Sequence, residues 1–269
     1  MLSNISRLLT YACALLYGIL GVLLFLFPAQ LAPVFAWKVT AFMTMTIGGW
    51  CLGNAWLAYI TAHRWEWKLV YTSLIYLWLF GISELIVLFL FHSKLKLESP
   101  IACLYFITLI MNVLTAFIGI FDYLRIRPSN ESSGLTITKV QSLPAVAFVI
   151  FVGFLGLYGL TAQIGSPGTN AGIFPEVMSL FTLRSFGAFY FSLALAVMPF
   201  FWDRSLRSIL HHSFAAFGLI IFITVAAFVF IHLFNFVERP SGLAYFGAYL
   251  AVGIPLFFVL RKFGTGTGN

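Results

Sequence analysis

Long runs of apolar residues alternate with short polar segments along the whole chain. Each run has about 20 residues, the length that an α-helix needs to cross about 30 Å of hydrocarbon. Inside the runs, apolar residues do not alternate with polar ones, as they must in membrane-spanning strands. The eight runs lie at about residues 8–27, 40–61, 69–91, 101–124, 144–162, 180–201, 209–233 and 242–260. The pattern predicts an all-α membrane protein with eight transmembrane helices.

Several residues recur at a constant spacing of 140 positions. His92, Glu98, Pro100, Tyr105 and Phe106 recur as His232, Glu238, Pro240, Tyr245 and Phe246. Such self-similarity is typical of a duplicated structural unit. It predicts a first four-helix repeat over residues 1–127, a polar linker over 128–142 and a second four-helix repeat over 143–269.

The number of predicted helices in each repeat sets the relative orientation of the repeats. An even number of spans brings both repeats into the membrane from the same side, so we expect parallel repeats and not an inverted pair. The loops on one side carry ten Lys and Arg residues, against five on the other side when Arg184 is included. The excess of basic residues predicts a multi-pass protein of the cell membrane with both termini in the cytoplasm.

The composition excludes other classes of protein. The chain is 61% hydrophobic and 9% charged, and its mean hydropathy is +1.01. A soluble domain has a far larger charged fraction, about 25%. The net charge of +7 is spread over separate loops, which argues against binding of nucleic acid. We therefore expect membrane lipids, and other membrane-protein subunits, as partners.

Two charged residues inside the predicted spans are the main candidates for a site, because ionisable groups are rare in membrane helices. Glu84 and Arg184 have similar predicted depths in the outer half of the membrane. They could form an ion pair between the repeats, or bind a substrate or a proton. Alternatively, Arg184 extends to the membrane surface and Glu84 is a neutral group bonded to a nearby hydroxyl. Their repeat counterparts are Thr224 and Thr44.

Two histidines occupy equivalent positions in the two repeats. His92 and His232 each end a predicted span at the outer surface, six residues before a glutamate, Glu98 or Glu238. Equivalent histidines could ligate a haem or, with the glutamates, a metal ion. The simpler interpretation is that both are ordinary residues of the membrane interface. The sequence assigns no cofactor beyond this possibility.

Small residues mark the second predicted helix of each repeat. Gly48, Gly49 and Gly187 lie there and would allow neighbouring helices to approach closely. We expect these two helices to lie inside the bundle.

Part of the second repeat resembles a group of uncharacterised bacterial multi-helix integral membrane proteins. The resemblance covers mainly residues 180–250 and rests on the stretches SLFTLRSFGAFYFSLAL and RPSGLAYFGAYL. The matching residues are Arg184, Gly187, Ala188, Phe189, Arg239, Pro240, Ser241 and Tyr245. The first repeat departs from the pattern, since Thr44 stands where Arg184 would be. The resemblance implies no activity.

The predicted function follows from what the spans contain. No phosphate-binding loop, zinc-protease motif or nucleophile elbow is found in the sequence. Most spans are built of Phe, Leu, Ile, Val and Ala. We therefore expect a non-enzymatic membrane protein that binds an apolar ligand or lipid, or serves as a structural subunit of a membrane complex. The alternatives are a transporter for a small amphipathic solute that uses Glu84 and Arg184, and an intramembrane enzyme or haem-bearing electron carrier.

Overall fold

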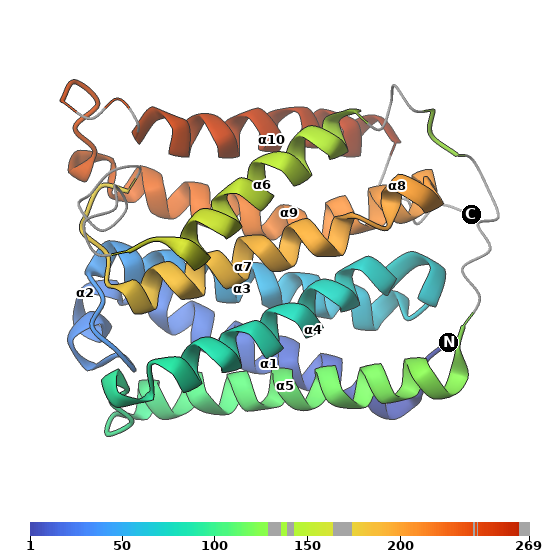
Figure 1. Cartoon of the computed structure of the whole chain (residues 1–269), viewed down its shortest axis with the longest axis horizontal. Coiled ribbons are helices and arrows are strands. Elements are labelled where there is room, and N and C mark those ends of the chain that lie inside the picture. Colours follow the sequence, from blue (N-terminus) through green and yellow to red (C-terminus); the bar gives the residue numbers. More distant parts are fainter. Residues whose placement is uncertain (129–135, 139–142, 164–173, 239, 241, 264–269) are drawn as a thin grey trace.

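The computed structural model describes residues 1–128, 136–138, 143–163, 174–238, 240 and 242–263. Over these ranges the chain is a bundle of helices without β-strands, apart from one isolated bridge between Thr136 and Ser205 (Figure 1). The long helices are α1 (Asn4–Leu26), α3 (Ala41–Arg64), α4 (Trp67–Leu90), α5 (Pro100–Ile126), α6 (Leu143–Thr161), α7 (Leu180–Val197), α9 (Leu206–Val229) and α10 (Gly242–Phe263). The short ones are α2 (Pro28–Leu31), η1 (Ala32–Val34), η2 (His92–Lys94), α8 (Phe200–Asp203) and η3 (Ile231–Leu233).

Within the described ranges, five helical segments are long and apolar enough to cross a membrane: α1, α4, α5, α7 together with α8, and α9. Large apolar side chains are exposed on the outside of the bundle, where water would be an unfavourable solvent for them. Examples are Leu8, Leu15 and Ile19 on α1, and Leu114, Phe117 and Phe121 on α5. These features fit an integral membrane protein.

Hydroxyl side chains define where several of the long helices begin. Ser3, Thr40, Ser99, Ser179 and Ser205 each precede a helix and accept a hydrogen bond from the backbone N–H three residues later. Such caps satisfy one of the backbone donors that a helix start leaves free. The short polar segments between the apolar runs therefore contain the signals that start the helices.

The long helices run back and forth between two ends of the bundle (Figure 1). α1 begins and α10 ends at the same end, which we call the terminal end. There, Trp65 donates from Nε1 to the Leu2 carbonyl at 3.2 Å. At the opposite end, the backbone N–H of Lys96 donates to the Ala36 carbonyl at 2.8 Å. In both cases two long helices separate the bonded residues in sequence. Segments that are two helices apart thus meet at the same end of the bundle.

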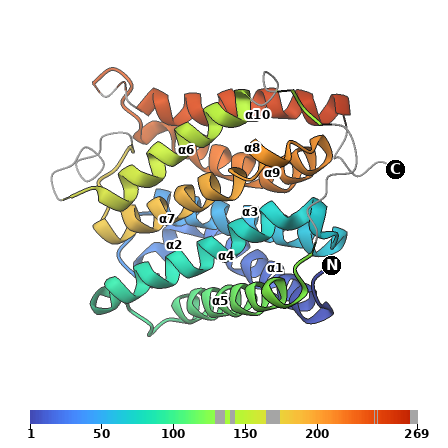
Figure 2. The ribbon, with the colours of Figure 1, turned by 45° about the vertical axis from the view of Figure 1, so that its right-hand side comes forward.

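The second long helix in each half of the chain lies at the centre. α3 packs against α1 and α9, whereas α7 packs against α6 and α4 (Figure 2). In an 18-residue apolar stretch of α7 and α8, 78% of the residues are buried. In the corresponding stretch of α1, 39% are buried. α7 is therefore surrounded by protein, and α1 has a face turned away from the bundle.

Glycines allow these helices to approach closely. A Cβ atom added to Gly48 would lie 2.6 Å from the backbone nitrogen of Phe25 on α1, and one on Gly187 would lie 2.5 Å from that of Leu160 on α6. At Gly49, the backbone of Phe222 on α9 would be 3.2 Å from an added Cβ. Larger residues at Gly48 and Gly187 would push backbones apart.

This geometry predicts that Gly187→Ala destabilises the bundle by about 1–3 kcal/mol, the usual cost of overpacking a close contact. Gly153→Ala is the matched control, because an added Cβ there would meet only Ala194 Cβ on the same pair of helices, at an ordinary 3.7 Å. Unfolding by SDS in mixed micelles, followed by circular dichroism, measures both variants. Equal stability of the two would contradict the packing of α6 on α7.

Candidate functional site

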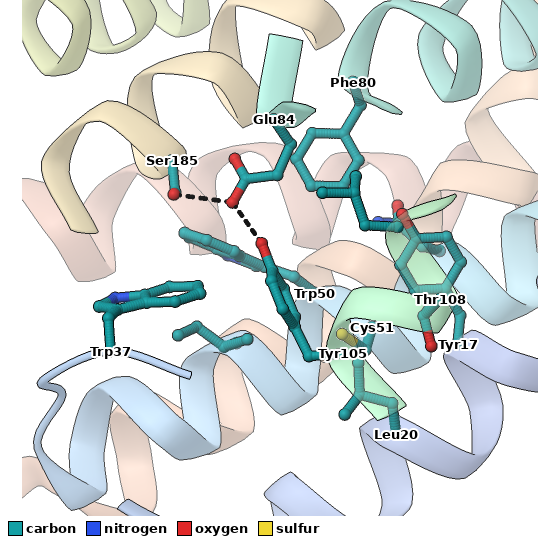
Figure 3. Close-up of a pocket in the computed structure, with 13 residues that line it drawn as sticks. Tyr17, Leu20, Trp37, Trp50, Cys51, Phe80, Glu84, Tyr105, Thr108 and Ser185 are labelled. Atoms are coloured by element: carbon teal, nitrogen blue, oxygen red, sulfur yellow. Dashed lines mark hydrogen bonds between the residues drawn. The ribbon is translucent and has the colours of Figure 1, made fainter. Parts of the chain in front are cut away.

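Glu84 is the single acidic residue of α4, and only 4% of its surface is exposed. Its Oε1 accepts two hydrogen bonds, from the Tyr105 hydroxyl of α5 at 2.7 Å and from Ser185 Oγ of α7 at 2.8 Å (Figure 3). The carboxyl group therefore links three helices: α4 and α5 from the first half of the chain and α7 from the second half.

A small cavity of about 30 Å³ adjoins this carboxyl group. Three buried polar atoms at its wall have no hydrogen-bond partner within the described structure: Glu84 Oε2, Trp50 Nε1 and Asn54 Nδ2. A single water needs about 10–15 Å³ of such space and two or more polar partners. The cavity therefore has room for one or two waters next to residues whose polar atoms lack a partner.

Further polar side chains surround the cavity within the apolar core. Tyr76 donates from its hydroxyl to Asn54 Oδ1 at 2.7 Å, and Asn112 Nδ2 donates to the Tyr17 hydroxyl at 2.9 Å. Sequence reasoning considered only ionisable groups and missed these four residues. The asparagines inside apolar runs were a usable signal, because polar side chains in membrane helices usually bond across helices.

Arg184 does not pair with Glu84 in the structure, so the ion pair considered from the sequence is not formed. Its guanidinium donates instead to two backbone carbonyls at the end of α6, from Nη1 to Gly159 at 2.8 Å and from Nη2 to Ala162 at 2.6 Å. The last carbonyls of a helix lack partners within the helix, and a basic side chain can satisfy them. Arg184 therefore caps α6 and ties it to α7.

His92 and His232 lie exposed in the short helices η2 and η3. His92 Nδ1 is 2.9 Å from the Phe89 carbonyl oxygen, and the His232 ring packs beside Phe230. Among the residues that the structure describes, no three His, Cys, Asp or Glu side chains gather to hold a metal ion. A haem or metal site at His92 and His232 receives no support from this geometry.

An apolar groove lies between α1, α3 and α9, with a volume of about 760 Å³. Its walls are aromatic and aliphatic, with Tyr11, Leu15, Trp56, Tyr59, Phe214, Phe217 and Phe222 among them. Unlike the cavity at Glu84, it is open to the outside of the bundle. No local pattern predicts this groove, since its three walls come from distant parts of the chain.

Some sequence predictions fall on residues outside the described part. These are most of the linker at 128–142, Arg239, Ser241 and the side chain of Tyr245. Comparison with known proteins gives no match, whether to protein-family models, to curated proteins or to solved structures. The resemblance over residues 180–250 therefore stays a prediction, and function has to be argued from geometry.

Replacing Glu84 tests its role as the link between helices. Glu84→Leu leaves the hydroxyls of Tyr105 and Ser185 without their acceptor, and each unpaired buried group costs about 1–3 kcal/mol. Glu84→Gln keeps an Oε1 acceptor and should retain most of the stability. Unfolding by SDS in mixed micelles distinguishes the two variants. A Glu84→Leu protein as stable as the unmodified chain would refute this role.

Proposed function

We propose that the chain is an eight-span membrane protein built of two parallel four-helix repeats, with both termini in the cytoplasm. Each of the eight apolar runs contains one long helix. The central contacts are reciprocal: the second long helix of each half packs on the first helix of its own half and the third helix of the other. α1 begins and α10 ends at one end. These features support two equivalent halves with the same orientation.

For its function, we propose that the protein binds the acyl chain of a lipid in the groove between α1, α3 and α9, without catalysing a reaction. The groove itself is the observation that carries this proposal. Its volume of about 760 Å³ is within the usual range for ligand pockets, about 300–1,000 Å³. Its apolar walls and its opening toward the outside of the bundle suit a chain that enters from the bilayer.

Contacts between helices fix the shape of the groove. Trp56 on α3 donates from Nε1 to the Phe214 carbonyl on α9 at 3.2 Å. Tyr11 and Tyr59 meet edge to face across α1 and α3, with their ring centroids 6.1 Å apart. A preformed groove binds a flexible chain at lower cost than a surface that must first be ordered.

Photolabelling tests occupancy of the groove. We expect a phosphatidylcholine with a photoreactive diazirine in its acyl chain to label groove peptides of α1, α3 and α9 more than the lipid-facing surface of α5. Ala55→Phe fills the groove, whose wall includes Ala55, and should reduce this labelling several-fold. Ala147→Phe adds the same ring to an exposed alanine of α6 and is the control.

Uniform labelling of all lipid-facing helices, or labelling of α1, α3 and α9 that Ala55→Phe does not change, would exclude a specific chain in the groove. The exposed α5 residues Leu114, Phe117 and Phe121 report the level expected from bulk lipid alone.

A second candidate function is a carrier for a small amphipathic solute, with Glu84 as the binding group. The unpartnered Oε2 of Glu84 favours it, because buried ionisable groups in membrane helices often mark ion or solute paths. The cavity of about 30 Å³ is too small for such a solute, so this function requires helices to move apart. Solute uptake into proteoliposomes that is unchanged in Glu84→Gln would exclude it.

A further inference from the structure

Two basic side chains lie directly on the aromatic rings that line the terminal end of the groove. The guanidinium carbon of Arg7 lies 5.8 Å from the centroid of the Tyr11 ring. The His63 ring stacks on Tyr59, with centroids 5.8 Å apart and an angle of 20° between the planes. Both tyrosines belong to the groove wall. The apolar groove thus leads into a basic mouth formed by Arg7 and His63, and the exposed Arg64 follows His63 at the end of α3.

The position of the Arg7 side chain is fixed by the end of α3. Arg7 Nε donates to the Ala62 carbonyl at 2.8 Å, and Nη2 to the His63 carbonyl at 3.4 Å. These carbonyls belong to the last turn of α3, where helices have free acceptors. Arg7 Nη1 makes no hydrogen bond within the described part of the chain, so a donor on an oriented guanidinium is available to an anion.

The nearby acidic groups are engaged elsewhere and do not neutralise the mouth. Asp122 accepts hydrogen bonds from Ser3 and Ser6 and pairs with Arg125. Glu66 lies 3.6 Å from a guanidinium nitrogen of Arg207. Over the ranges described, neither carboxylate forms an ion pair with Arg7, His63 or Arg64. The mouth therefore keeps its positive charge.

We propose that this mouth binds the phosphate of an anionic phospholipid whose acyl chain lies in the groove, an inference that rests on the proposed function. The α9 wall, from Phe214 to Phe222, is about 12 Å long at the rise of an α-helix. Half of the hydrocarbon core is about 15 Å thick. A lipid of one leaflet with its headgroup at Arg7 therefore has the length to place its chain along this wall.

Competition between lipids tests the proposal. Purified protein carrying the photoreactive phosphatidylcholine is titrated with phosphatidylglycerol or with unlabelled phosphatidylcholine of the same chain length. We expect phosphatidylglycerol to compete about five-fold more strongly, the effect of roughly one added basic contact at a membrane surface. Arg64→Gln and Arg7→Gln should each remove most of this preference. Arg261→Gln, which removes an exposed charge from the end of α10, should leave it intact.

Arg64→Gln tests the charge more directly, because Arg7→Gln also removes hydrogen bonds to the last carbonyls of α3. Arg7→Lys keeps the charge but not the forked geometry and should retain part of the preference.

Equal competition by the two lipids, or an unchanged preference in Arg64→Gln and Arg7→Gln, would overturn the basic mouth as a phosphate site. If both lipids displace the probe equally from a groove that Ala55→Phe blocks, only this inference fails. If Ala55→Phe leaves the labelling of α1, α3 and α9 unchanged, the proposed function itself is wrong.

Discussion

The exclusion of water from the centre of a bilayer is the constraint on which this structure depends. A polar group there must find its partner within the protein. The bundle meets this requirement in two ways: some buried hydroxyls, such as that of Thr46, bond a carbonyl of their own helix, and other polar side chains bond across helices. Glu84 connects α4 with α5 and α7, and Arg184 connects α7 with α6. The two charged residues that the sequence offers for ligand binding or an ion pair thus form hydrogen bonds between helices in the structure.

The same constraint explains how the ends of the bundle are held. Asp122 near the end of α5 accepts hydrogen bonds from Ser3 and Ser6, which secures the start of α1. At the opposite end, Trp37 stacks on Phe181 of α7 with centroids 4.3 Å apart and donates from Nε1 to Thr182 at 3.1 Å. The loop after η1 is therefore fixed to the second half of the chain. Between these ends, the groove is the place where α1, α3 and α9 leave a wide apolar space.

Hydropathy alone was sufficient to locate the helices, because each apolar run contains one. The run at 8–27, for example, contains most of α1, which spans Asn4–Leu26. Burial of Glu84 could also be expected from its place in an apolar run. The partner of Arg184 could not, since backbone carbonyls of α6 carry no signature in the sequence. The groove and the bond between Trp56 and Phe214 depend on how α3 and α9 pack, which no local pattern records.

Labelling of single cysteines from outside the cell tests the central claim, parallel repeats with eight crossings, most directly. In a variant without its three native cysteines, one cysteine each replaces Glu66, Lys94, Arg127 and Glu238. The account predicts that an impermeant maleimide labels positions 94 and 238 in intact cells, and positions 66 and 127 only after permeabilisation. Labelling of 94 and 238 from opposite sides would contradict the parallel arrangement and, with it, the placement of the basic mouth in the cytoplasmic leaflet.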